Sequence, residues 1–479
     1  MSSESAGGDK PLHWADDPHM SPVDTVMWRG DADRRLRSTL GMLEIYDCAP
    51  DWNRLVAAHD WASRMAPRFR ERVVESPLRM GTPSWAVDPD FDLHYHLRRI
   101  RLGGDNSLAE LLRTCEQLGM TPLDPARPPW EGYLIEDLPD GKTAYFVKAH
   151  HALTDGLGAI MGLAQLHSTT RDPIPGKPQP PAPDVHGPSG LDVLRRQLEQ
   201  EARRVPVIAG KVVDGALALT SPRSALSKVL RYGRSVPRVA GLISPPGSPL
   251  LAGRSVGRRY AAFEVPFSSL KAASTATRSS INDVYLGGLI GGFRHYHERM
   301  GTMVDAIPVA VPISVRSDDD TPGGNRIAVG RLAGPVGIDD PFERVLTVRE
   351  QVRAARTEPA VDVFNTAGPL LAWLPGPVLT QFSGATSMND LQASNVPGIP
   401  WDTFVAGAKV ERMFPFGPLP GCAVMATMIT HNGIACLGLN LDPAAITEPD
   451  VFAECITAGF DEVIDLAGDD SLPRMTELR

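Results

Sequence analysis

The sequence predicts a mixed α/β (α+β) protein made of two large units. Strand-like and helical patterns alternate in both halves of the 479 residues. Hydrophobic residues make up 42% and charged residues 22% of the chain, so it can bury a sizeable core. A proline-rich stretch interrupts the alternation near the middle. These three observations together favour two domains joined by a connector.

The patterns of the first half run from residue 11 to residue 171, after a polar tail at residues 1–10 that we expect to be disordered. Apolar residues with helical spacing share one face after Trp52, and a β-prone run follows the turn signal Asp140-Gly141. The predicted elements are a strand at Leu36–Ile45, a helix at Trp52–Met65, a strand at Ala144–Ala149 and an apolar helix at Asp155–His167.

Residues 172–255 are predicted to form the connector. Seven prolines lie between Asp172 and Gly190, a composition that favours an extended chain over packed core. A charged helix at Leu191–Arg204 and a weaker helical stretch at Val205–Gly233 follow. From Leu191 to Tyr260 the chain has 13 Arg or Lys and 4 Asp or Glu, a net charge of +9 within a chain of −9. This segment either contacts anionic lipid or packs as a solvated connector along the acidic remainder.

The second half, residues 256–479, repeats the alternation of strands and helices. Helical spacing of apolar residues and short β-prone runs between turns give the boundaries. The predicted elements are a strand from Tyr260, a helix at Asn282–Tyr296, a strand at Ile307–Val315, a helix at Pro341–Arg356, strands at Phe404–Val410, Val424–Thr430 and Ile434–Leu441, and a closing helix at about Glu448–Leu466.

Composition excludes several classes of protein. A chain with a net charge of −9 is a poor candidate for broad nucleic-acid binding. Five cysteines without a CxxC pair argue against a disulfide framework or a cysteine-based zinc site, and they fit a reducing cytosol. The polar start does not read as a signal peptide, and no run of eighteen apolar residues occurs. We therefore expect a cytoplasmic protein that binds no metal, with peripheral membrane contact left open.

The most informative motif is His150-His151-Ala-Leu-Thr-Asp155-Gly156, at the end of a predicted strand. The chain has no GxSxG elbow, no phosphate-binding loop, no GxGxxG fingerprint and no HExxH. A histidine can accept a proton near neutral pH, and a carboxylate is favoured at a helix start. Gly156 permits close packing. The alternative is that the two histidines are structural or contribute to a metal site.

This motif resembles that of the CoA-dependent acyltransferase superfamily, which includes chloramphenicol acetyltransferase, carnitine acyltransferases and condensation domains. An ordered set of further motifs makes nearly the whole chain similar to the bacterial wax ester synthase/diacylglycerol acyltransferase family. The set comprises Met20-Ser-Pro-Val-Asp24, Pro83-Ser-Trp85-Ala-Val-Asp-Pro-Asp-Phe-Asp92, Pro122-Leu-Asp124, Arg127-Pro128-Pro129-Trp130-Glu, Ile281-Asn282-Asp283-Val, Val311-Pro-Ile-Ser-Val-Arg316, Gly324-Asn325-Arg326 and Ser394-Asn395-Val-Pro397-Gly398.

The resemblance implies two chloramphenicol-acetyltransferase-like halves, each a mixed sheet with helices, that meet around a tunnel. It implies that His151 is the general base, that His150 helps to position it, and that Asp155 supports the loop by pairing with an arginine, for which Arg316 is the candidate. Gly156, Asn282 and Asp283 would support the site, although Asn and Asp at a helix start are also common capping residues.

Two further segments are expected to bind substrate. One comprises Pro128, Pro129 and Trp130, where Pro129 replaces the family's leucine, stiffens the backbone and could change the chain-length preference. The other comprises Ser394, Asn395, Pro397 and Gly398, which could instead be only a turn.

The function that the resemblance implies is transfer of an acyl group from acyl-CoA, a substrate rather than a cofactor, to diacylglycerol or a long-chain alcohol. The products would be triacylglycerol or wax esters, and the enzyme could lie at the inner membrane face or on lipid droplets. Two alternatives are acylation of a polyketide or glycolipid alcohol and a non-catalytic lipid-binding protein of the same fold. The intact HHxxxDG motif argues against the second.

Overall fold

The structure is a computed structural model that describes residues 17–77, 79, 81–153, 162, 165–172, 178–185, 188–196, 198–199, 245–314, 327–356 and 389–478. The predicted tail at 1–10, the helical stretch at Val205–Gly233, and most of the predicted helix at Asp155–His167 lie outside these residues. Of the predicted helix at Leu191–Arg204, residues 191–196, 198 and 199 are described and helical.

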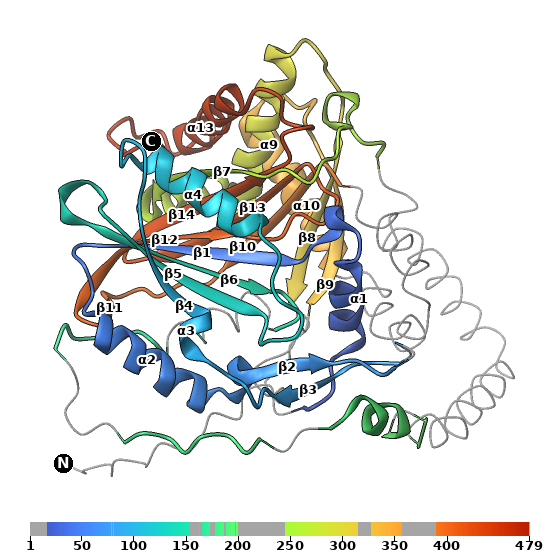
Figure 1. Cartoon of the computed structure of the whole chain (residues 1–479). Coiled ribbons are helices and arrows are strands. Elements are labelled where there is room, and N and C mark those ends of the chain that lie inside the picture. The colour runs from blue at the N-terminus through green and yellow to red at the C-terminus, as the bar shows by residue number, and fades with distance from the viewer. Residues whose placement is uncertain are drawn as a thin grey trace, which may run out of the picture.

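The first sheet has six strands in the order β11-β12-β1-β6-β5-β4 (Figure 1). Capping side chains mark where its helices begin. Ser21, Asp51 and Ser107 accept a hydrogen bond from a backbone N–H in the first turn of α1, α2 and α4, respectively. The elements up to the motif are α1 Pro22–Gly30, η1 Arg34–Leu36, β1 Thr39–Tyr46, α2 Trp52–Met65, η2 Pro67–Arg70, β2 Glu71–Val74, β3 Ser84–Val87, α3 Leu93–His96, β4 Leu97–Arg101, α4 Leu108–Met120, β5 Trp130–Glu136, η3 Pro139–Gly141 and β6 Thr143–His150.

The second sheet has seven strands in the order β15-β7-β14-β13-β10-β8-β9. Helices α8, α9, α10 and α13 cover it, and α9 packs most extensively on α13 (Figure 1). The elements are η4 Pro249–Leu251, β7 Arg259–Pro266, α8 Phe267–Thr277, α9 Ile281–Arg299, β8 Ile307–Ser314, β9 Ile327–Gly334, α10 Pro341–Arg356, β10 Leu391–Val396, β11 Phe404–Val405, β12 Ala408–Phe416, β13 Val424–His431, β14 Ile434–Leu441, α13 Pro449–Asp465 and β15 Thr476–Glu477.

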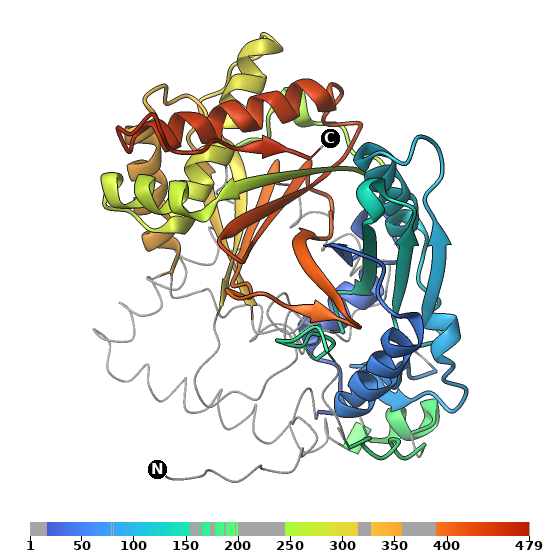
Figure 2. The same cartoon turned by 90° about the vertical axis from the view of Figure 1, so that its left-hand side faces the viewer.

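Strands β11 and β12 join the two halves. They come from the C-terminal part of the chain, yet β12 pairs antiparallel with β1 in the first sheet. Figure 2 shows these strands, in orange, between the blue-to-teal first half and the helices of the second. At the junction, Tyr260 of β7 stacks on Phe416 of β12 with ring centroids 4.0 Å apart. The backbone of Gly438 approaches the Pro415 carbonyl so closely that a Cβ would lie 2.0 Å from its oxygen.

Two buried clusters form most of the core. One lies between the second sheet and its helices, and it includes Phe263, Leu289, Phe293 and Phe460. The other lies on the first sheet and draws members from both halves, because Tyr260 and Ile429 pack in it beside residues of β1, β5 and β6. The halves therefore share apolar core in addition to a sheet.

Several element boundaries differ from those that the sequence pattern predicts, and two of these differences have a clear local cause. The strand expected from Leu36 begins at Thr39, because the Asp33 side chain accepts from the Arg35 N–H and caps a 3₁₀ turn at 34–36. The strand expected at Phe404–Val410 is split into β11 and β12, because Ala406 and Gly407 form a turn with φ of 47° and 95°.

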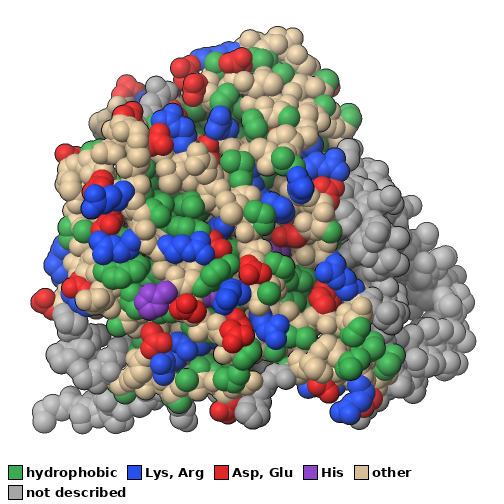
Figure 3. All heavy atoms as spheres, viewed as in Figure 1, with side chains coloured by type: hydrophobic (Ala, Val, Ile, Leu, Met, Phe, Trp, Pro, Cys, Tyr) green, Lys and Arg blue, Asp and Glu red, His purple; other side chains and the backbone are tan. Residues whose placement is uncertain are grey.

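On the face drawn in Figure 3, basic and acidic side chains are interspersed with scattered hydrophobic ones. This face shows none of the extended basic surface that nucleic-acid binding requires. In the described part of the chain, no helix is both long and apolar enough to cross a membrane.

Candidate active site

The histidine pair lies at the end of β6, an inner strand that pairs with β1 and β5. His150 is the last strand residue, faces Thr39 of β1 in register, and its side chain is only 2% exposed. His151 is the first residue beyond the strand and is partly exposed. The strand thus holds one histidine in the interior and leaves the other accessible.

The ring of His150 has defined neighbours on both nitrogens. Its Nδ1 accepts a hydrogen bond of 3.0 Å from the Ala152 N–H, and its Nε2 lies 3.4 Å from Asp31 Oδ1. The Trp28 indole meets the ring edge-on at 5.0 Å. These contacts fit a neutral ring with its proton on Nε2.

The backbone of the motif is also fixed on both sides. The His151 N–H donates to the Ser38 carbonyl at 2.8 Å, and the His150 N–H donates to the Pro129 carbonyl at 2.9 Å. Pro128, Pro129 and Trp130 are buried next to the motif at the start of β5. Pro129 contributes a carbonyl here, a role that a proline can fill despite its missing N–H.

Trp130 anchors this segment from the other side. Its indole N–H donates to the Phe69 carbonyl at 2.8 Å, and its ring stacks on His96 with centroids 4.8 Å apart. The His96 Nδ1 in turn bonds to the Trp130 carbonyl at 2.8 Å. The expected substrate-binding segment is therefore held in place on both sides, next to the histidines.

Ser394 and Asn395 lie within strand β10, so the alternative that they form a turn is wrong for these two residues. Ser394 pairs with Thr427 of β13, and successive strand residues face opposite sides of the sheet. Pro397 and Gly398 follow the strand. A Cβ at Gly398 would lie 1.7 Å from the Thr430 carbonyl oxygen, so only glycine fits there without a shift of the backbone.

Successive strand pairings show that the segment around Ser394 lies toward the histidine motif. Thr39 of β1 faces His150, Gly41 faces Phe416 of β12, and Gly417 follows Phe416. A Cβ at Gly417 would lie 2.9 Å from the Thr427 hydroxyl, and Thr427 faces Ser394. Since neighbouring strands lie about 4.8 Å apart, β12 is about 10 Å from β6. The structure thus brings Ser394 toward the motif from the other half.

The remaining predicted residues fall into two groups. Asp283 accepts from the Ser280 N–H at 2.8 Å while the Ser280 hydroxyl accepts from the Asp283 N–H, so Asp283 takes the capping alternative at the start of α9. Asn282 is the second residue of that helix and partly exposed. Asp155, Gly156 and Arg316 lie outside the described residues.

Two buried pairs of polar side chains support the strands around the site. Glu44 Oε1 lies 3.0 Å from His167 Nε2, and the Tyr46 hydroxyl donates to the same carboxylate at 2.7 Å. Burial acts to raise the pKa of Glu44, but His167 and the hydrogen bonds hold it below its ordinary value. Lys148, two residues before His150, lies 3.1 Å from Glu131 Oε2, and burial lowers the pKa of this lysine.

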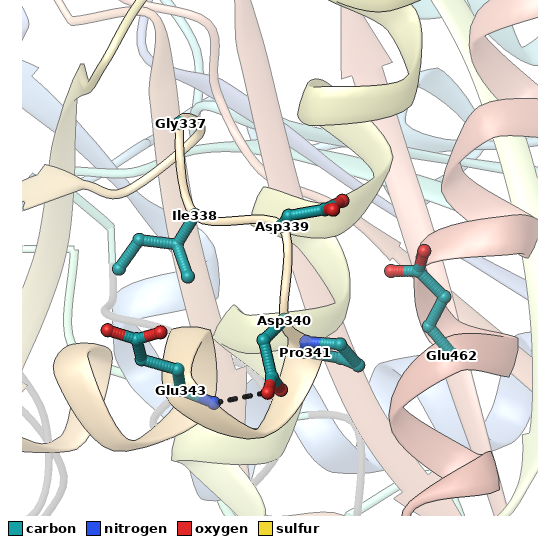
Figure 4. A pocket seen from close by; sticks show the side chains of 7 residues that line it. All are labelled: Gly337, Ile338, Asp339, Asp340, Pro341, Glu343 and Glu462. Atoms are coloured by element: carbon teal, nitrogen blue, oxygen red, sulfur yellow. Dashed lines mark hydrogen bonds between the residues drawn. The ribbon is translucent and has the colours of Figure 1, made fainter.

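An open depression lies elsewhere, beside the start of α10 (Figure 4). Its lining includes Asp339, Asp340 and Glu343 near that helix and Glu462 of α13, and it includes neither motif histidine. Within the described ranges, no group of three or more His, Cys, Asp or Glu side chains could hold a metal ion.

Comparisons with known proteins address the family directly. The family model of the wax ester synthase/diacylglycerol acyltransferase catalytic domain matches residues 20–285, and the model of the family's C-terminal domain matches residues 323–463. The chain belongs to this family. It is therefore an O-acyltransferase.

Individual relatives agree with this assignment. A Mycobacterium tuberculosis H37Rv protein provisionally named diacylglycerol O-acyltransferase, Rv2484c, is 39% identical over 94% of this chain and 92% of its own. A wax ester synthase/diacylglycerol acyltransferase from Marinobacter aquaeolei VT8 has the same fold, with a TM-score of 0.63 and 21% identity over 94% of this chain and all of the other. The first condensation domain of the CDA synthetase matches with a TM-score of 0.60, 19% identity, and coverage of 96% and 99%. The expected two-half α/β architecture is confirmed.

Three residues that contact the motif could not be predicted from the sequence. Trp28, Asp31 and Ser38 contact the histidine pair from a segment more than a hundred residues earlier in the chain. Only the pairing of β1 with β6 brings them there, so no local spacing signals them.

Proposed function

We propose that the protein transfers the acyl group of acyl-CoA to the hydroxyl of a lipid alcohol, with diacylglycerol giving triacylglycerol and long-chain alcohols giving wax esters. Family membership supplies the reaction class. The observation that carries the proposal is the histidine pair, in which a partly exposed His151 is held by Ser38 beside a fully packed His150. In this proposal acyl-CoA is a substrate, and no cofactor takes part.

In the proposed mechanism, His151 accepts the proton of the alcohol hydroxyl as its oxygen attacks the thioester carbonyl. The tetrahedral intermediate collapses, its carbon–sulfur bond breaks, and CoA leaves as a thiolate, which is a good leaving group because a thiol pKa is about 8.5. The imidazolium then returns a proton to the thiolate. This sequence requires no covalent acyl-enzyme, in keeping with the absence of a nucleophile elbow.

The other residues of the motif have supporting roles in the proposal. We expect from the family resemblance that Asp155 holds the loop by pairing with Arg316 and that Gly156 allows close packing; these three residues lie outside the described part of the chain. In the proposal, Trp130 and Ser394 line the substrate path from opposite halves. Trp130 of β5 pairs with Ala149 of β6, directly before the histidines, and Ser394 of β10 pairs with Thr427 of β13.

The test is release of CoA thiol from long-chain acyl-CoA in the presence of diacylglycerol, a long-chain alcohol or a glycolipid alcohol, with the lipid product identified by mass spectrometry. We expect turnover with the first two acceptors and its loss in His151→Ala. The matched control is His94→Ala, since His94 has a side chain that is 78% exposed and lies in another segment. Full turnover by His151→Ala would refute the general-base role.

We further propose that the protein docks peripherally on an anionic lipid surface through the helix around residues 190–199. Leu191 and Leu198 are 70% and 56% exposed, large values for leucine, and are seven residues apart, so they share one helix face. Arg195 lies between them, is exposed, and lies 3.7 Å from Glu199. The described part of this helix has as many acidic as basic residues, so the basic character comes from the whole segment Leu191–Tyr260, with its net charge of +9. Apolar and basic side chains together are typical of helices that lie in a lipid interface.

Flotation with vesicles of phosphatidylcholine and phosphatidylglycerol tests this location. The variants Leu191→Ser/Leu198→Ser and Arg195→Glu/Arg196→Glu are expected to float less than wild type. Val256→Ser, at an equally exposed apolar residue outside the helix, is the control. Unchanged flotation of both variants would contradict the docking proposal and favour the solvated-connector alternative.

A further inference from the structure

We infer that Asp31 positions both histidines of the motif, an inference that rests on the proposed function. Asp31 is the residue that directly ends α1, and its side chain is 30% exposed. Neither the motif nor the sequence pattern assigns it a role. Its carboxylate makes two contacts, one leading to the ring of His150 and one to the backbone of His151.

The first contact concerns the ring of His150. Because Nδ1 accepts from the Ala152 N–H, the proton of the neutral ring is on Nε2, which points toward Asp31 Oδ1 at 3.4 Å. In the described part of the chain, Nε2 has no partner at ordinary hydrogen-bond geometry. The Asp31 carboxylate is therefore placed to attract this N–H and to hold the ring against rotation.

The second contact concerns the backbone of His151. Asp31 Oδ1 accepts from the Ser38 N–H at 2.9 Å, and the Ser38 carbonyl accepts from the His151 N–H at 2.8 Å. Ser38 is itself buried and directly precedes β1. Asp31 Oδ1 thus fixes Ser38, whose carbonyl in turn holds the backbone of the general base His151.

Together these contacts predict a specific effect on catalysis. Asp31 does not touch the reacting atoms in this arrangement, so its loss leaves substrate affinity largely unchanged. A small misplacement of a base lowers the rate of proton transfer. Loss of Asp31 is thus expected to lower kcat by about 10- to 100-fold while KM for acyl-CoA changes by less than about twofold.

Three variants separate positioning from general stability. Asp31→Ala removes both contacts and is expected to show the fall in kcat. Asp31→Asn keeps an oxygen that accepts from Ser38 and faces Nε2, so it should recover most of the rate. Asp339→Ala, at a 91% exposed aspartate that pairs with Arg294 far from the motif, is the control. Wild-type kcat in Asp31→Ala, a rise in KM alone, or an Asp31→Asn as slow as Asp31→Ala would overturn the inference.

A double-mutant cycle and one spectroscopic measurement complete the test. In a His150→Ala background, Asp31→Ala should cost less kcat than in wild type, because one of its two contacts is already gone. In histidine-¹⁵N-labelled protein, the ring proton of His150 should be on Nε2 and should exchange faster in Asp31→Ala than in wild type or Asp339→Ala. A proton on Nδ1, or unchanged exchange, would refute the inference whether or not the protein transfers acyl groups.

Discussion

Stability toward acid should depend on one buried histidine, His59 of α2. Its side chain packs against β6 with Nδ1 2.8 Å from the Leu55 carbonyl and Nε2 2.7 Å from the Tyr145 hydroxyl, and the residue is 4% exposed. Burial lowers the pKa of His59 from 6.5 to about 4. The native fold therefore contains this imidazole in its neutral form.

The sign and size of the effect follow from proton binding. Because the pKa of His59 is lower in the folded than in the unfolded chain, the unfolded chain binds more protons between pH 6.5 and pH 4, and stability is lost as pH falls through this window. At about 1.36 kcal/mol per unit of pKa, the loss is about 2 kcal/mol at pH 5 and about 3 kcal/mol below pH 4.

Urea unfolding at pH 7.5 and pH 5.0 measures this loss. Other groups titrate in the same range, so the informative quantity is the difference in unfolding free energy between wild type and His59→Gln. We expect wild type to be more stable at pH 7.5 and the difference to shrink by about 2 kcal/mol at pH 5.0. His94→Gln, on the surface, serves as the control. An equal difference at both pH values would show that the folded chain does not resist protonation of His59, contrary to this prediction.

Two further predictions concern the strands that carry the site. Gly398→Ala should destabilise the fold by about 2 kcal/mol or more, because the new Cβ would meet the Thr430 carbonyl. The control is Gly103→Ala, which should not destabilise the fold, since no atom lies within 4 Å of its new Cβ. Equal melting temperatures of the two variants would contradict this prediction. Lys148→Met should cost about 3 kcal/mol in unfolding free energy, because Glu131 loses its buried cation and keeps the half-exposed Arg98 at 3.5 Å, and because two backbone carbonyls lose the Lys148 ammonium as donor. Adding Glu131→Gln should recover part of the loss, and strict additivity would contradict the pairing.

Elements with strong local signals could be predicted from the sequence to the residue. The helices Trp52–Met65 and Pro341–Arg356 and the strand Ile434–Leu441 have the predicted bounds. In the first, an Asp51 cap precedes a run of helically spaced apolar residues, and the third follows a turn at Asn432-Gly433, where both residues have positive φ.

Pairing between distant strands could not be predicted in this way. Nothing near Ala408–Phe416 signals that it joins the first sheet, since that pairing depends on which edge of β1 is open. The same holds for the site. The motif itself marks His150 and His151, whereas Asp31 and Ser38 reach them only through the fold.

The proposed mechanism depends most on His151 as the base in acyl transfer. The most direct measurement is the pre-steady-state rate of CoA release from long-chain acyl-CoA with diacylglycerol, in wild type and His151→Ala, each first confirmed to be folded by circular dichroism. We predict that the variant binds acyl-CoA but loses at least about 100-fold in rate, within the range that general-base catalysis contributes. A folded His151→Ala that forms triacylglycerol at the wild-type rate would contradict it.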